Sequence, residues 1–401
     1  MTPLPVPGGV TAARGFSAAG VSCGVKKTGP DLALVVSDRL ASAAGLFTTN
    51  RATAAPVLVS REHLRASEGH ARALVANSGC ANACTGPAGL EAARLMAAET
   101  ARAVGCEVEH VLVASTGVIG VQLDTRKIGT GIIGAAGALH RDGHAEAARA
   151  IMTTDPWPKE HAVRVETPLG AFVVGGMAKG SGMIEPRMAT MLGFLTTDAA
   201  VPPGRLRRAL TDAAEDTFNA ITVDGECSTN DSVFALANGM SGVALDERGD
   251  EDFVEALRGV CRELALGIVR GGEGATKLVT VLVTGAVSYA DAQAAARAIA
   301  NSPLVKTAVH GGDPNWGRLL AVAGRSGSAF EVGRARVGIG SVVLFADGRP
   351  FDERAPEAAR QLTGREVTLA VDLGTGGPYE ATMWTCDLSA DYVRINAEYR
   401  T

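Results

Sequence analysis

Short apolar runs, separated by glycine and alternating with alanine-rich stretches, constrain the fold of this chain more than any other sequence feature. Runs over 32–36, 55–60, 73–76 and 108–115 have the length and composition of buried strands. The stretch over 89–104 places its leucine, methionine and several alanines on one helical face, with charged residues between them. The first part of the chain therefore predicts strands packed against helices.

The order of predicted elements changes toward the end of the chain. Segments 161–166 and 170–174 predict a hairpin. From about residue 278 onward, predicted strands and helices follow one another in mixed order. In that tail we expect a strand over 278–283, a helix over 290–300, and strands over 337–343, 366–371 and 380–385. The predicted class is α/β (α+β), with a main lobe over 1–277 and a smaller α+β lobe over 278–401.

Charge and composition exclude several classes of protein. The 401 residues carry 38 Lys and Arg against 43 Asp and Glu, a net charge of −5, which argues against a nucleic-acid partner. The start of the chain resembles neither a signal peptide nor an anchor, and no stretch approaches the ~18 apolar residues of a membrane span. Seven scattered cysteines, an odd number, favour a reducing compartment. We expect a cytoplasmic protein without a membrane partner.

Familiar cofactor and metal motifs are not complete in this sequence. Segment 271–277 is glycine-rich but lacks the order of a phosphate loop, and 117–120 lacks the third glycine of a dinucleotide fingerprint. There is also no G-x-S-x-G nucleophile elbow. Cys80 and Cys84 have no second Cys or His pair of zinc-site spacing. We therefore predict neither a cofactor nor a metal.

Thr190 follows the most unusual segment of the chain. Glycine and serine crowd 175–182, Pro186 follows, and Thr190 stands near the entrance of an apolar run over 188–195. One interpretation is an ordinary packed strand threonine. The other is a nucleophile, because cleavage before Thr190 would give the hydroxyl a base in the residue's own α-amine. The reference pKa of an α-amine is about 7.7–8.0, so a usable fraction is neutral near pH 7.

Six separated motifs of the chain are distinctive, and they are Lys179-Gly-Ser-Gly-Met-Ile-Glu-Pro-x-Met-Ala-Thr190-Met-Leu192, Asn77-Ser-Gly-x-Ala-Asn82, Ser115-Thr-Gly-Val-Ile-Gly120, Ile151-Met-Thr-Thr-Asp155, Ser228-Thr-Asn-Asp231 and Asp313-Pro-Asn-Trp-Gly-Arg318. Together these motifs closely resemble the ornithine acetyltransferase (glutamate N-acetyltransferase) family of arginine biosynthesis. The resemblance runs from about Gly15 to the end of the chain.

The resemblance implies self-cleavage and a covalent acetyl-enzyme. Members cut themselves at the bond that here joins Ala189 and Thr190, giving an α chain of 1–189 and a β chain of 190–401. The freed Thr190 takes acetyl from N²-acetylornithine and passes it to glutamate by a ping-pong route. Some members also use acetyl-CoA as donor. The family assembles as a heterotetramer of two α and two β chains, on an N-terminal-nucleophile-like layered fold.

The same resemblance assigns roles to further residues. Thr116 and Gly117 match the oxyanion hole, and both follow a predicted strand. The substrate-binding positions are Thr153, Lys179, Thr190, Glu273, Asn396 and Thr401. Of these, Lys179 is suited to a substrate carboxylate, and Glu273 to the ornithine amine.

Two other functions remain open from the sequence. An amidase or aminopeptidase of the same nucleophile type would pass the acyl group to water. A small-molecule binding protein would leave Thr190 inert and the chain uncut. Lys179, Glu273 and the full set of motifs favour the transferase.

Overall fold

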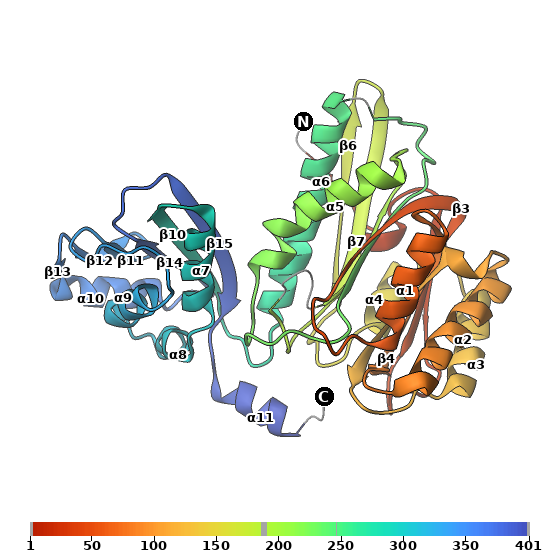
Figure 1. Ribbon diagram of the computed structural model, residues 1–401, viewed down its shortest axis with the longest axis horizontal. Coiled ribbons are helices and arrows are strands. Elements are labelled where there is room, and N and C mark those ends of the chain that lie inside the picture. The colour runs from red at the N-terminus through yellow and green to blue at the C-terminus, as the bar shows by residue number, and fades with distance from the viewer. Residues whose placement is uncertain (1–2, 186–190, 246, 399–401) are drawn as a thin grey trace. The chain divides into compact units, whose positions relative to one another are not determined.

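The computed structural model describes residues 3–185, 191–245 and 247–398 (Figure 1). For residues 247–250 it describes the backbone alone. The chain forms two compact units. Over the described residues, the first comprises 3–219 and 227–268, with the gaps just given, and the second comprises 220–226 and 269–398. The predicted cleavage bond between residues 189 and 190 lies outside the described residues.

The first unit is built on a sheet that, over the described residues, has nine strands. Its order is β1-β6-β7-β8-β9-β3-β4-β5, and β2 pairs with β3. The strands are β1 (Leu4–Pro5), β2 (Phe16–Val21), β3 (Leu32–Phe47), β4 (His70–Cys80), β5 (Val111–Val118), β6 (Lys159–Thr167), β7 (Gly170–Lys179), β8 (Leu192–Thr197) and β9 (Ser232–Ala237). The predicted hairpin is confirmed as β6 and β7, which pair antiparallel from Lys159↔Ala178 to Thr167↔Gly170.

Strand β3 belongs to both halves of this sheet. Its first half pairs with β4 over Leu32–Val36, its second half pairs with β9 over Ser42–Phe47, and the β4 register shifts between Val36 and Ala41. One buried core joins side chains of β4 and β5, such as Leu74 and Leu112, to side chains of β8 and β9, such as Phe194 and Phe234. The sheet is therefore folded into two layers that face each other across this core.

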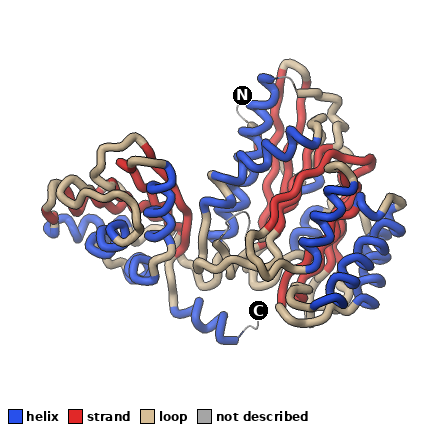
Figure 2. The backbone as a smooth tube through the Cα atoms, in the orientation of Figure 1, coloured by secondary structure: helices blue, strands red, loops and turns tan. Residues whose placement is uncertain are grey.

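Helices cover the outer faces of both layers (Figure 2). A second core packs α1 (Ala55–Ala66), α2 (Gly86–Val104) and α3 (Thr125–Gly137) on the β4–β5 layer. On the other layer, α6 (Glu247–Arg270) places Phe253 against Phe172 of β7, with ring centroids 6.0 Å apart. The remaining helices are α4 (His144–Ala150) and α5 (Pro203–Glu215). The predicted α/β class with layered sheets and outer helices is confirmed.

One predicted strand is wrong. Residues 55–60 read as an apolar strand, but they form the first turns of α1. Pro56 occupies the first turn of that helix, where a missing N–H costs nothing. The buried side chains Val57, Ser60 and His63 recur with helical spacing, and the strand-like composition of the run hides this periodicity.

The second unit is an α+β structure around a six-stranded sheet in the order β13-β12-β11-β14-β10-β15 (Figure 1). The strands are β10 (Leu278–Ala286), β11 (Arg336–Ile339), β12 (Val342–Ala346), β13 (Arg349–Pro350), β14 (Glu366–Asp372) and β15 (Tyr379–Cys386). The helices are α7 (Tyr289–Ala300), α8 (Pro303–Gly311), α9 (Trp316–Gly324), α10 (Ala355–Gln361) and α11 (Ala390–Glu398). The single strand predicted over 337–343 is wrong, because Gly340 turns with φ 57° and separates β11 from β12.

Candidate active site

Thr116 and Lys179 meet where the ends of β5 and β7 approach each other. In β5, Leu112, Ala114 and Thr116 alternate with residues of the other face, and the first two belong to the core between the layers. In β7, the core residues Val173 and Met177 share this alternation with Lys179. The Nζ atom of Lys179 donates a hydrogen bond of 3.3 Å to Oγ1 of Thr116. Because Oγ1 accepts this bond, its own hydrogen is available to a third group.

Gly117 is required where β4 and β5 approach each other. Its φ is +127°, and a Cβ placed there would lie 2.4 Å from the carbonyl carbon of Gly79. The parallel pairing of the two strands also becomes irregular at Gly79 and Cys80. A side chain at position 117 would therefore disrupt the strand end that carries Thr116.

Lys179 also marks where the chain re-enters the sheet after the predicted nucleophile. Its backbone pairs with Leu192, the first residue of β8. Thr190 stands two positions before Leu192 in the sequence. Ala189 and Thr190 themselves lie outside the described residues, so their predicted roles stay predictions.

Asp155 holds together three segments around Lys179. Its Oδ2 accepts a hydrogen bond of 3.0 Å from the backbone N–H of Thr153, and its Oδ1 accepts one of 2.8 Å from Gly180. Lys159 forms a buried ion pair with Oδ1 at 2.5 Å. This carboxylate thus fixes Thr153, Lys159 and the residue after Lys179 relative to one another.

Lysine ammonium groups dominate the electrostatics around Asp155. Burial alone would raise the pKa of Asp155, but the ammonium groups of Lys179 and Lys159 outweigh burial and lower this pKa to about 2. Burial in turn lowers the pKa of Lys159 and that of Lys26. Lys26 interacts with both Asp155 and Lys179, and its Nζ donates to the carbonyl oxygen of Met152 at 2.9 Å. The region therefore gathers three lysines around Asp155, and two further buried carboxyl groups lie near them, since Asp31 also interacts with Lys26 and Asp231 with Lys179.

The segment Ser228–Asp231 connects β5 to β9. The Nδ2 atom of Asn230 donates to the carbonyl oxygens of Ala81 and Ser115, at 2.5 Å and 2.9 Å. Ser115 directly precedes Thr116, so Asn230 fixes the strand end that carries the predicted oxyanion donor. This gives the segment a positional role in the site.

Glu273 and Asn396 contact each other in the second unit. The Nδ2 atom of Asn396, in α11, donates a hydrogen bond of 2.7 Å to Oε2 of Glu273. Glu273 is buried, at 5% exposure. Gly274, with φ +68°, packs so closely on the start of α11 that a Cβ would lie 2.5 Å from the backbone nitrogen of Tyr392.

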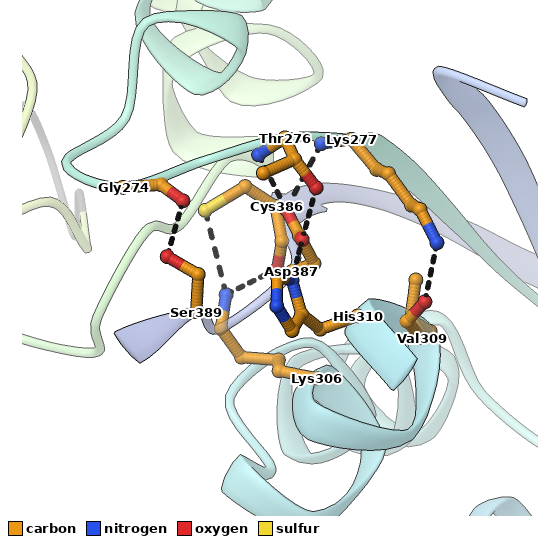
Figure 3. Close-up of polar contacts among 9 residues, drawn as sticks. All are labelled: Gly274, Thr276, Lys277, Lys306, Val309, His310, Cys386, Asp387 and Ser389. Atoms are coloured by element: carbon orange, nitrogen blue, oxygen red, sulfur yellow. Dashed lines mark hydrogen bonds and ion pairs between the residues drawn. The ribbon is translucent and has the colours of Figure 1, made fainter. Parts of the chain in front are cut away.

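A polar cluster anchors the loop that carries Glu273 (Figure 3). Asp387 accepts hydrogen bonds from the backbone N–H groups of Thr276 and Lys277, at 2.8 Å and 2.9 Å, and its Oδ2 lies 2.7 Å from Nδ1 of His310. Ser389 donates to the carbonyl oxygen of Gly274 at 2.6 Å. Burial raises the pKa of Asp387, but hydrogen bonds from Thr276 and His310 lower it below its usual value. The loop that carries Glu273 is thus held by Ser389 at Gly274 and by Asp387 at the two residues that precede β10.

The predicted site residues fall into two groups. Thr116, Gly117, Thr153 and Lys179 lie together in the first unit, and Glu273 and Asn396 lie together in the second. Thr401 lies outside the described residues. Sequence reasoning missed the parts played by Asp155, Lys159 and Asp387. Asp155 stands in the motif over 151–155, which could have drawn attention to it, whereas no sequence motif contains Asp387.

Comparison with known proteins decides the family. The family model described as the ArgJ family matches residues 17–401. The chain belongs to the ArgJ family. The resemblance seen in the sequence is confirmed.

Relatives match the chain over nearly its whole length. The Arginine biosynthesis bifunctional protein ArgJ of Symbiobacterium thermophilum is 50% identical, covering 98% of this chain and 99% of the relative. The protein of the same name from Nitratidesulfovibrio vulgaris is 49% identical, covering 97% and 99%. The solved ornithine acetyltransferase of Mycobacterium tuberculosis, complexed with ornithine, is 42% identical over 47% of this chain and 100% of the solved chain, with a TM-score of 0.44.

The described residues form neither a metal centre nor a membrane span. No group of three or more His, Cys, Asp or Glu residues among them is arranged to hold a metal ion. No helix in the described part of the chain has the length and apolarity to cross a membrane.

Proposed function

We propose that this ArgJ-family chain is a self-processing acetyltransferase of arginine biosynthesis. Thr190, freed by cleavage after Ala189, takes acetyl from N²-acetyl-L-ornithine and releases L-ornithine. It then passes the acetyl group to L-glutamate, giving N-acetyl-L-glutamate. An acetylated Thr190 divides the exchange into two similar half-reactions, each of which breaks and remakes a bond to the same acyl carbon.

The hydrogen bond between Lys179 and Thr116 is the observation that carries this proposal. It places a hydroxyl donor at the end of β5 beside a lysine whose backbone pairs with the strand following Thr190. Thr116 O–H and the N–H of Gly117 supply donors for the oxyanion that forms when the acetyl carbonyl is attacked.

The charges around the site suit the proposed substrates. Acetylornithine and glutamate both carry a carboxylate, and we assign its binding to Lys179, as the family resemblance implies; the Lys179 ammonium lies beside the Thr116 hydroxyl. For the side-chain ammonium of acetylornithine the family resemblance assigns Glu273, whose buried carboxylate accepts a hydrogen bond from Asn396 within the second unit. No cofactor is needed for either half-reaction.

Release of ornithine with and without glutamate tests the proposal against the hydrolase alternative. A transferase releases ornithine from acetylornithine at a sustained rate only when glutamate is present. Equal sustained release without glutamate would identify an amidase of the same nucleophile type. Because relatives of this chain are named bifunctional, a parallel assay with acetyl-CoA and glutamate tests whether it also uses a second acetyl donor.

We further propose that two α and two β chains assemble as a heterotetramer in the cytoplasm. The family resemblance is the support for both statements. Light scattering of the purified protein tests the assembly, and a mass equal to that of one 401-residue chain would contradict it.

A further inference from the structure

Lys26 reaches the candidate site from the loop that precedes β3. Residues 22–31 form this loop, which connects β2 to β3. Asp31 is fully buried, and its two carboxylate oxygens accept hydrogen bonds from the N–H groups of Cys23 and Lys26, at 2.6 Å and 2.8 Å. The carbonyl oxygen of Asp31 in turn accepts a hydrogen bond of 2.9 Å from the N–H of Ser78 in β4. The backbone of Lys26 is therefore tied to β4 through one buried residue.

The side-chain stem of Lys26 packs on Gly79, where β4 and β5 approach each other. A Cβ placed on Gly79 would lie 2.6 Å from Cγ of Lys26, and a Cβ placed on Gly117 would lie 2.4 Å from the carbonyl carbon of Gly79. Glycine at position 79 thus lets the lysine cross the strand end that carries the predicted oxyanion residues. The Nζ atom of Lys26 then donates a hydrogen bond of 2.9 Å to the carbonyl oxygen of Met152.

Met152 and Thr153 share a peptide group whose two polar groups are both bound by side chains. Lys26 binds its carbonyl oxygen, and Oδ2 of Asp155 accepts a hydrogen bond of 3.0 Å from its N–H. This peptide lies between α4 and β6, outside the helices and strands, so its place depends on these side chains. The charges of Lys26 and Asp155 attract each other, so the two contacts support one another.

We propose that Lys26 is a positioning residue for substrate binding, an inference that rests on the proposed function. The family resemblance assigns substrate binding to Thr153, and Lys26 sets the place of that residue by holding the peptide group that joins it to Met152. Lys26 thus acts through Thr153 rather than on the reacting acetyl group. An ammonium suits this task, because a charged donor forms a stronger hydrogen bond to a carbonyl oxygen than a neutral donor does.

Steady-state kinetics of the wild type and Lys26→Met test the inference, with acetylornithine varied at saturating glutamate. Methionine keeps the part of the stem that packs on Gly79 but has no hydrogen to donate to Met152. We expect KM for acetylornithine to rise by about 3–10-fold, as for loss of one neutral hydrogen bond to the substrate, with kcat unchanged. Lys26→Arg restores a charged donor and should lower KM again. A fall in kcat at constant KM would place Lys26 in the chemical step and overturn the positioning role.

A double-mutant cycle with Thr153→Ala separates positioning from a general loss of structure. Thr153→Ala alone should raise the same KM by a similar factor. Lys26→Met should add nothing to it, because the side chain that Lys26 positions is then gone. Effects that multiply in the double variant would mean that Lys26 acts independently of Thr153, and they would overturn the inference.

Lys27→Met is the matched control, because Lys27 is the next residue of the same loop and is exposed. We expect the wild-type KM for this variant. An equal rise in both lysine variants would assign the effect to net charge and overturn the inference. An unchanged KM in Thr153→Ala, while the wild type transfers acetyl, overturns the inference alone. A wild type that transfers no acetyl from acetylornithine to glutamate overturns the proposed function as well.

Discussion

Lys179 Nζ donates a hydrogen bond of 3.3 Å to Thr116 Oγ1, although the two residues stand 63 positions apart in the chain. The bond joins the end of β5, in one layer of the folded sheet, to the end of β7, in the other. Lys179 is 8% exposed, so its ammonium is directed by neighbouring groups more than by solvent. This pair fixes the orientation of the hydroxyl that we assign to the oxyanion hole.

Thr116→Ala removes that hydroxyl and leaves the N–H of Gly117 as the remaining proposed donor. We expect kcat for acetyl transfer to fall by about 10²–10³-fold, the usual cost of losing one oxyanion donor. Steady-state kinetics at saturating acetylornithine and glutamate measure the change. Thr100→Ala is the control, because the Thr100 hydroxyl is also buried but donates to Met96 within α2. A wild-type kcat in Thr116→Ala would remove the hydroxyl from the mechanism.

Gly117→Ala tests the close approach of β4 and β5. The new methyl group would lie 2.4 Å from Gly79, so we expect strand displacement and loss of both self-cleavage and transfer. Gly120→Ala is a matched control, since Gly120 also has positive φ, +80°, but no atom lies within 4 Å of the position that its Cβ would take. Its expected cost is limited to backbone strain, about 1–2 kcal/mol. Thermal unfolding and intact mass, compared between the two variants, separate crowding from strain.

The lowered pKa of Asp155 predicts how the stability of the folded protein depends on pH. Its pKa is lowered to about 2 in the folded protein, against an ordinary value of 3.8, so the folded state prefers the carboxylate. The stabilisation is present above the ordinary value and is lost as the pH falls toward 2. We expect this group to contribute on the order of 2 kcal/mol.

Urea unfolding of wild type and Asp155→Asn at pH 5 and near pH 2 measures this contribution. The wild type should lose more free energy of unfolding between the two pH values than the variant, which has no carboxyl to protonate. At pH 5 the variant should be less stable by about 3–5 kcal/mol, because Lys159 and Lys179 lose their buried counter-charge. Identical pH dependence in both proteins would show that Asp155 is not the acid-sensitive group.

Glu273→Gln separates donor binding from self-processing. Glutamine keeps the size of the side chain and an oxygen that can accept from Asn396, but it removes the charge offered to the substrate ammonium. We expect KM for acetylornithine to rise by about 10–100-fold, as for loss of a charged hydrogen bond, with cleavage unchanged. Glu366→Gln is the control, because Glu366 pairs with Arg270 at the surface of the same unit, at 3.0 Å. Equal KM values in wild type and Glu273→Gln would contradict the assignment.

Local pattern was enough to predict much of the fold, and the exceptions have physical causes. The runs at 32–36, 73–76 and 108–115 fall in β3, β4 and the η2 (Val108–His110)–β5 segment, because consecutive apolar residues suit strands buried on both faces. The run at 55–60 has the same composition, yet tertiary packing on the β4–β5 layer selects a helix. The bend in β3 that folds the sheet on itself depends on contacts distant in sequence, so no local pattern indicates it.

The candidate site likewise contains residues that the sequence indicated and residues that it did not. The family resemblance assigned roles to Thr116, Gly117, Thr153, Lys179, Glu273 and Asn396, and the first four stand within the motifs that carry the resemblance. The contact between Lys179 and Thr116 could not be predicted from these segments, because it depends on the folding of the sheet into two layers. Asp387 could not be found from the sequence, because an isolated acidic residue after a strand does not reveal that it accepts bonds from Thr276 and Lys277.

Intact-mass spectrometry of the purified protein after incubation with acetylornithine, without glutamate, tests the central claim most directly. The account predicts two chains, 1–189 and 190–401, with one acetyl group added to the second chain and removed when glutamate is supplied. A single uncut 401-residue species, or cut chains that never carry acetyl, would contradict it.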